Sequence, residues 1–149
     1  MSEEHVFRVS TTWSPEAKEG RLKNADGTLA VPVSSAPCLG GKTGVTNPEE
    51  LLLSALGTCF VQTWAIFLAK LKVPIENPVL DGTCELDKDP NGGYRLTKFD
   101  LVPHVPKAIW EERREDIEKT LALAEKYCIV SKAVRGEGRD LLVTPKLVD

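Results

Sequence analysis

The stretch that decides the fold is residues 47–60, which read NPEELLLSALGTCF. Asn47 is a good helix cap and Pro48 suits the first helical position. Glu50 stands at the third helical position, where it can complete a capping box with Asn47. These residues predict a helix that begins at Asn47, and Pro74 is expected to mark its end.

The predicted helix is apolar on all sides. It is expected to run to about Lys72, and from Leu51 to Ala69 it carries no charged residue. That length is near the minimum for a bilayer span. However, the segment contains serine, glycine, threonine and glutamine, and an all-apolar helix also suits the centre of a globular core. We therefore expect a buried helix and no membrane partner.

Strands are expected on both sides of this helix. Residues 5–13 are rich in β-forming types, and residues 21–33 are typical of a hairpin around the turn at 24–27. Residues 79–102 predict a second hairpin, whose turn lies at 89–93.

The C-terminal third is expected to be mostly helical. A helical pattern covers residues 107–127, with one stripe on its inner face, and a short second helix is expected between Cys128 and Gly136. A last strand is expected over residues 141–143. The stripe consists of Ile109, Arg113, Ile117, Leu121 and Ala124. The order of elements predicts an α+β fold in one domain over residues 1–149.

The composition is that of an ordinary soluble protein. The 149 residues carry a formal net charge of −3, so nothing suggests nucleic acid or an anionic membrane as a partner. The N-terminal stretch over residues 1–13 lacks the basic-then-apolar layout of a signal peptide. We therefore expect a cytoplasmic protein, in which cysteines stay reduced unless they are functional.

The four cysteines do not form a familiar motif. There is no CxxC pair, and the two histidines do not pair with a cysteine in the sequence, so we expect no metal and no cofactor. Cys59 lies deep in the apolar helix and Cys128 at the end of the second helix. Taken alone, each is best interpreted as inert packing. Cys38 and Cys84 are expected to be non-catalytic.

Several motifs together resemble the OsmC/Ohr family of peroxiredoxin-like organic hydroperoxide reductases. The Asn-Pro-Glu opening of residues 47–60 stands at the family's interval before Cys59, and Phe60 follows that cysteine. The family's features also include Gly20-Arg21, the Asp26-Gly27 turn, the glycine-rich lead-in at 40–48 and CIVSKAV at 128–134. The resemblance covers most of the chain, in the same order.

The resemblance implies a role for four residues. Cys59 would be the peroxidatic thiol and Cys128 the resolving thiol. Arg21 matches the family's arginine and Glu49 its glutamate. A permanently charged guanidinium would stabilise the Cys59 thiolate, and a carboxylate would hold it in place. This chain departs from the family at Ile129, where the family usually has proline.

The resemblance also implies an OsmC-like fold, with antiparallel sheets packed around a long buried central helix in an intertwined homodimer. The spacing of Glu49 and Cys59 bears on this arrangement. Ten residues of helix separate them by about 15 Å, too far for both to serve one thiolate within a chain. We expect Glu49 of one copy to approach Cys59 of the other. Small residues at Ser54, Ala55 and Gly57 would allow a close crossing.

The implied activity is reduction of organic hydroperoxides to alcohols in oxidative stress defence. Cys59 would become a sulfenic acid and then a disulfide with Cys128, which a dithiol, such as a lipoyl protein in the Ohr branch, would reduce. Two alternatives stay open: a non-enzymatic redox sensor or binding module on the same fold, and a purely structural dimer with buried cysteines.

Overall fold

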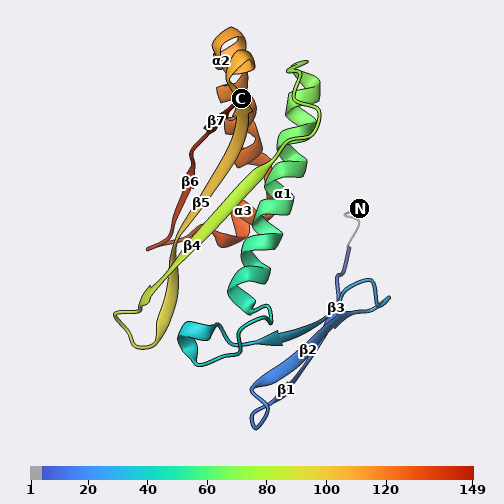
Figure 1. The fold of residues 1–149 in the computed structure, drawn as a ribbon, viewed down its shortest axis with the longest axis vertical. Helices are drawn as coiled ribbons and strands as arrows, with labels where there is room; N and C mark the ends of the chain where they lie inside the picture. The colour runs from blue at the N-terminus through green and yellow to red at the C-terminus, as the bar shows by residue number, and fades with distance from the viewer. Residues whose placement is uncertain (1–4) are drawn as a thin grey trace. The chain divides into compact units, whose positions relative to one another are not determined.

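The structure is a computed structural model that describes residues 5–149 (Figure 1). It contains two compact units, the first ending at Leu51 and the second covering Leu52–Asp149. Residues 1–4, on which part of the signal-peptide expectation rests, lie outside the described residues.

The first unit is built on an antiparallel sheet with the strand order β1-β2-β3. Its strands are β1 (Val9–Ser14), β2 (Glu19–Asn24) and β3 (Ala30–Ser34). The predicted hairpin is confirmed as β2 and β3, while the first strand begins at Val9 rather than at residue 5. A short 3₁₀ helix, η1 (Pro37–Leu39), lies in the loop that follows.

The long helix α1 (Pro48–Lys70) begins where the sequence predicts. The Asn47 side chain accepts a hydrogen bond from the backbone N–H of Glu50 at 2.9 Å, which makes it the cap. The reciprocal half of the capping box is absent, because the Glu50 carboxylate instead accepts a hydrogen bond from the Thr46 hydroxyl. The helix ends at Lys70, four residues before Pro74.

The second unit contains a four-stranded sheet. Strands β4 (Leu80–Lys88) and β5 (Tyr94–Pro106) form the predicted second hairpin. Strands β6 (Asp140–Val143) and β7 (Lys146–Val148) both pair with β5 in parallel. The expected antiparallel pairing holds for β4 with β5, whereas β6 and β7 depart from it. The chain returns to β5 through two helices, and such a crossover allows parallel pairing.

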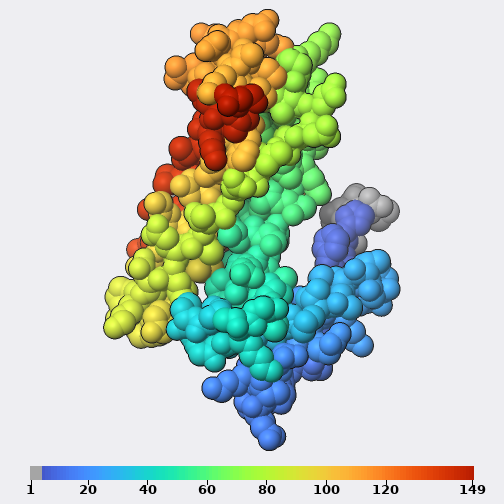
Figure 2. Space-filling model, viewed as in Figure 1, coloured from blue at the N-terminus to red at the C-terminus, as the bar shows by residue number. Residues whose placement is uncertain are grey.

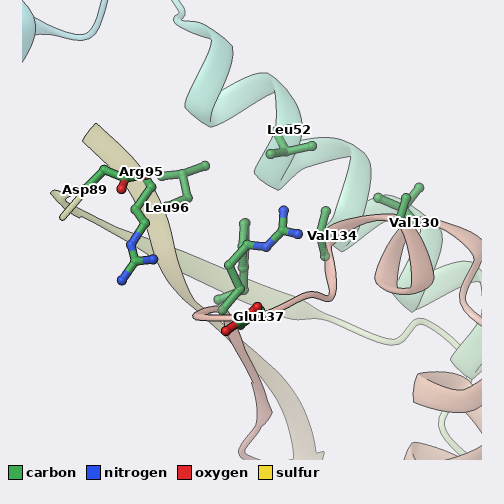
Figure 3. A pocket seen from close by; sticks show the side chains of 10 residues that line it. Leu52, Asp89, Arg95, Leu96, Val130, Val134 and Glu137 are labelled. Atoms are coloured by element: carbon green, nitrogen blue, oxygen red, sulfur yellow. The ribbon is translucent and has the colours of Figure 1, made fainter. Parts of the chain in front are cut away.

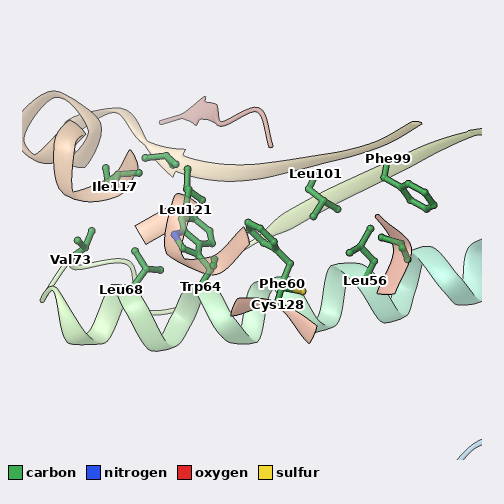
Figure 4. Close-up of a cluster of buried hydrophobic side chains, with 13 residues drawn as sticks. Leu56, Phe60, Trp64, Leu68, Val73, Phe99, Leu101, Ile117, Leu121 and Cys128 are labelled. Atoms are coloured by element: carbon green, nitrogen blue, oxygen red, sulfur yellow. The ribbon is translucent and has the colours of Figure 1, made fainter. Parts of the chain in front are cut away.

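The two returning helices are α2 (Lys107–Tyr127) and α3 (Ile129–Val134), as predicted. The three helices and β5 share one hydrophobic core, in which Trp64 and Phe99 are the bulkiest contributors from α1 and β5 (Figure 4). Arg113 does not join the inner stripe of α2. Its backbone is non-helical, and its guanidinium donates to the carbonyl oxygens of Leu71 and Lys72 just beyond α1.

Helix α1 is buried on one stripe only, which comprises Leu56, Phe60, Trp64 and Leu68. On other faces Ile66 remains 53% exposed and Leu52 38% exposed. Much of α1 is visible at the surface as the green band beside β4 (Figure 2). The expectation of burial on all sides is thus wrong for the single chain. By length and composition alone, α1 is also apolar enough to cross a membrane.

Candidate active site

Cys59 and Cys128, which are 69 residues apart in the sequence, meet in the second unit. The two sulfur groups lie close enough to shift each other's pKa in opposite directions. Cys59 is partly exposed on α1, whereas Cys128 is fully buried between α2 and α3, close to Phe60 (Figure 4). The sequence expectation that these two cysteines act together therefore has the contact it requires.

The junction between α2 and α3 fixes the position of Cys128. The residue is extended, with φ −63° and ψ 115°, so it ends one helix and caps the next. Its backbone N–H donates to the carbonyl oxygen of Ala124, and its sulfur accepts from the backbone N–H of Ser131 at 3.4 Å. Sulfur here performs the role that an oxygen performs in an ordinary helix cap.

The surroundings of Cys59 favour its thiolate. Burial is the largest single influence and raises the pKa of Cys59, but hydrogen bonds outweigh it and the pKa is lowered overall. The donors are, in order, the backbone N–H of Val130, the Cys128 thiol, the backbone N–H of Ile129 and the Thr63 hydroxyl. Thr63 contributes least, and its hydroxyl hydrogen is directed at the Cys59 carbonyl oxygen at 2.8 Å.

The surroundings of Cys128 favour its neutral thiol. Burial raises the pKa of Cys128, and the neighbouring Cys59 sulfur raises it further. The nearby side chain and the backbone N–H of Ser131 lower it, but do not offset the burial. The pair therefore holds one sulfur prone to ionise and one sulfur that keeps its proton and donates it to the first.

Cys59 opens onto a groove of about 640 Å³. Most of its walls are apolar or aromatic, and Lys70 supplies a positive charge. The rings of Phe67 and Tyr127 stack with their centroids 5.6 Å apart, and Lys70 Nζ lies 5.4 Å from the Phe67 ring centre. The groove is lined by Cys59, Gln62, Thr63, Ile66, Phe67, Lys70, Leu123, Tyr127 and Ile129.

A second pocket of about 580 Å³ lies between the start of α1, β5 and α3 (Figure 3). Its apolar lining includes Leu52 and Val134, and Arg95 and Glu137 bring opposite charges to it. No cysteine lines this pocket. The groove at Cys59 is therefore the candidate active site.

Arg21 and Glu49 belong to the first unit, whereas Cys59 and Cys128 belong to the second. Arg21 is exposed on β2, and its guanidinium forms no hydrogen bond or ion pair with another residue in the described part of the chain. Glu49 lies in the first turn of α1. Its Oε2 atom is buried and has no hydrogen-bond partner among residues 5–149.

The other candidate ligands and thiols lie apart from the groove. Cys38 is exposed in η1, and Cys84 is half-buried on β4. Across residues 5–149, no three histidine, cysteine or acidic side chains are grouped as a metal site would require. Of the four cysteines, Cys59 lines the groove and Cys128 lies beside it.

Sequence reasoning missed the donors around the two sulfurs. Thr63 lies one helical turn after Cys59, and this i, i+4 spacing was the available signal for it. Ser131 follows Cys128 by three residues, which is the spacing of a capping interaction. The backbone N–H groups of Ile129 and Val130 could not be assigned to Cys59, because they reach it only through the packing of α3 on α1.

Two neighbouring thiols with opposite pKa shifts, one of them open to an apolar groove, have the arrangement expected of a redox-active dithiol. The family comparison agrees with this class. The family model described as "OsmC-like protein" matches residues 40–139, and the chain belongs to this family.

The relatives are proteins linked to hydroperoxide resistance. Over 128 residues the chain is 30% identical to "Organic hydroperoxide resistance protein-like 2" of Staphylococcus epidermidis, covering 85% of this chain and 87% of that protein. This membership indicates a peroxide-related redox function.

Solved structures share the fold. An organic hydroperoxide resistance protein OsmC from Legionella pneumophila is 22% identical with a TM-score of 0.80, and the match covers 97% of this chain and 99% of that chain. The organic hydroperoxide resistance protein OhrB of Bacillus subtilis is 24% identical with a TM-score of 0.72, over 97% and 98% of the two chains. The predicted OsmC-like α+β fold is confirmed.

Proposed function

We propose that this protein is a thiol-dependent peroxidase that reduces organic hydroperoxides to alcohols in oxidative stress defence. The observation that carries the proposal is the contact between Cys59, whose pKa is lowered, and Cys128, whose pKa is raised. A thiolate is the form that attacks a peroxide. A neighbouring protonated thiol is ready to resolve the product.

The proposed cycle has three steps. The Cys59 thiolate attacks the terminal oxygen of the hydroperoxide, the O–O bond breaks, and the alkoxide takes a proton and leaves as an alcohol. Cys59 is then a sulfenic acid, and the Cys128 sulfur displaces its hydroxyl as water to form a disulfide. A dithiol reduces this disulfide by exchange and becomes a disulfide itself. A lipoyl protein is the reductant that the family resemblance suggests.

The groove supports a preference for organic hydroperoxides over hydrogen peroxide. Ile66, Phe67 and Leu123 offer apolar contact to the organic group of a substrate whose peroxide oxygen reaches Cys59. Burial of such a group is favourable in proportion to its apolar area. Hydrogen peroxide has no apolar surface to bury, so it gains nothing from these walls.

Arg21 and Glu49 are proposed to complete the site. The buried Oε2 atom of Glu49 lacks a partner in the described part of the chain, and an unpaired buried carboxylate is costly. A guanidinium is a well-matched bidentate partner for a carboxylate. Arg21, which also lacks an ion-pair partner among residues 5–149, is the candidate to fill that role and to face the Cys59 thiolate.

We further propose that the two units act as one domain within a cytoplasmic homodimer that shares its active sites. The support is the apolar surface that α1 leaves open on one chain, with Ile66 at 53% and Leu52 at 38% exposed. A second copy of α1 would cover it. The spacing of Glu49 and Cys59 along the helix calls for the same arrangement.

The proposal is tested by replacing each cysteine in turn. Cys59→Ser should abolish peroxide consumption. Cys128→Ser should consume about one equivalent and then stop as a sulfenic acid, which a dimedone adduct on Cys59 would reveal by mass spectrometry. Cys38→Ser is the matched control and should keep wild-type turnover.

Two outcomes would contradict the proposed peroxidase activity. Wild-type turnover in either Cys59→Ser or Cys128→Ser would refute the two-cysteine cycle. A wild-type protein that forms the disulfide but stops after one equivalent, with reductant present, would instead be a redox sensor.

A further inference from the structure

The hydroxyl of Ser131 is an unexplained buried group beside the cysteine pair. Ser131 is 0% exposed, and its Oγ atom has no hydrogen-bond partner among the described residues. A buried hydroxyl without a partner is unfavourable, so such groups call for a reason. The hydroxyl lies near enough to the Cys128 sulfur to lower its pKa, but in the resting state it makes no hydrogen bond of ordinary geometry to that sulfur.

The position of Ser131 supplies the reason. Its backbone N–H already donates to the Cys128 sulfur at 3.4 Å, so the residue touches a reacting atom. Its side chain also acts on that sulfur, because it lowers the pKa of Cys128. A neutral thiol is a weak acceptor, whereas a thiolate accepts strongly. The hydroxyl is therefore in position to donate a hydrogen bond to the Cys128 sulfur when that sulfur carries negative charge.

The different exposure of the two sulfurs determines the step at which Cys128 becomes negatively charged. Cys59 opens onto the groove, while Cys128 is 0% exposed. An incoming dithiol can reach only the Cys59 sulfur of a Cys59–Cys128 disulfide. Cys128 is then the leaving sulfur, and the rate of exchange rises as the leaving thiolate becomes more stable.

We propose that the Ser131 hydroxyl is a catalytic hydrogen-bond donor to the Cys128 sulfur during formation and cleavage of the disulfide. The inference rests on the proposed function and adds the residue that controls its recycling step. It also assigns the order of attack: the reductant joins Cys59, and Cys128 departs.

The electron balance of the recycling step is as follows. A thiolate of the dithiol bonds to the Cys59 sulfur, and the Cys59–Cys128 bond breaks with its electron pair on Cys128. Ser131 donates its O–H and N–H to this thiolate until it is protonated. The second thiolate of the reductant then displaces Cys59 and closes the reductant's own disulfide. The dithiol loses two electrons and two protons, and the protein gains them.

The test separates this step from peroxide chemistry. The disulfide is formed with diamide, a general thiol oxidant, and its reduction by dithiothreitol is followed by stopped flow. Ser131→Ala should slow this reduction by on the order of tenfold to a hundredfold, the usual effect of losing a hydrogen bond to a charged group. Its oxidation of Cys59 by cumene hydroperoxide should change less than about twofold, because Ser131 does not donate to Cys59.

Three further measurements exclude a merely structural effect. Ser131→Ala should raise the Cys128 pKa in a Cys59→Ser background, and Ser131→Thr should restore the exchange rate. Thr120→Val removes another buried hydroxyl, one bonded to Trp64, and should leave the exchange rate unchanged. Equal reduction rates in wild type and Ser131→Ala, or failure of diamide to link Cys59 with Cys128, would overturn the inference. Loss of peroxide turnover with the Ser131 effect intact would overturn only the proposed function.

Discussion

At the residue scale, the reactivity of Cys59 depends on its neighbours in space more than on its own helix. Within α1 it is a partly buried cysteine in an apolar segment, and burial raises its pKa. The opposing donors come mainly from residues 128–130, which α3 brings to it. The motif resemblance singled out both cysteines, but two of the groups that lower the Cys59 pKa are backbone N–H groups, which no residue type in the sequence encodes.

The opposite pKa shifts predict that the two cysteines separate in a titration. Because the Cys59 pKa is lowered, its thiolate persists to lower pH, and its reactivity is lost only as the pH falls through that lowered pKa. Because the Cys128 pKa is raised, its thiolate appears only at higher pH. Alkylation by iodoacetamide at a series of pH values, read by peptide mass spectrometry, should therefore modify Cys59 first. Simultaneous modification of both would contradict these shifts.

Ile129 offers a second test at this scale. Its backbone N–H lowers the Cys59 pKa, and proline has no such group. Ile129→Pro should therefore raise the Cys59 pKa and slow peroxide attack near neutral pH. The fold should accept it, since Cys128 already has the extended backbone required before a proline.

Ile129→Ala is the matched control, because it shortens the side chain and keeps the N–H. The Cys59 pKa of both variants is measured by following thiolate absorbance near 240 nm as the pH is varied. A Cys59 titration that is the same in Ile129→Pro and wild type would show that this N–H has no part in the site.

At the scale of the elements, the ends of α1 show what local sequence can and cannot predict. The Asn47 cap was predictable, because capping depends on residues a few positions apart. The other end is held by Arg113 from α2, which bonds carbonyl oxygens of residues 71 and 72. That contact joins residues about forty positions apart, and the helical pattern of α2 suggested only an inner stripe. The strand at β6 was predicted, but its parallel pairing with β5 and the strand β7 were not, for the same reason.

Arg113 is accordingly expected to stabilise the fold. Arg113→Ala should lower the free energy of unfolding by about 1–3 kcal/mol, because it leaves two carbonyl oxygens and Asp116 without their donor. Arg114→Ala is the matched control: its pair with Glu118 is exposed and should contribute less than about 1 kcal/mol. Urea denaturation measures the free energy of unfolding of both variants. An equal loss in the two variants would contradict the capping role.

At the scale of the whole molecule, α1 leaves an apolar face exposed to solvent, which is the basis for proposing a second chain. The sequence predicted burial on all sides, and one chain buries only the stripe through Leu56 and Trp64. The homodimer proposed above supplies the missing surface. It would also bring Glu49 of one copy towards Cys59 of the other, which the rise of a single helix does not allow.

Complementation between inactive variants tests the shared site. Glu49→Gln and Cys59→Ser chains are mixed, unfolded and refolded together. In a dimer with shared sites, half of the products are heterodimers with one complete site each, so about a quarter of wild-type activity should return. Each variant refolded alone is the control. If Glu49 served the Cys59 of its own chain, the mixture would gain nothing beyond what the two variants show separately.

The most direct test of the central claim is steady-state turnover of cumene hydroperoxide by the wild-type protein, with lipoyl dithiol and thioredoxin compared as reductants. The account predicts many equivalents of alcohol per chain with at least one of these dithiols, slower turnover of hydrogen peroxide, and none with Cys59→Ser. Consumption that stops at one equivalent with every dithiol, or that persists in Cys59→Ser, would contradict it.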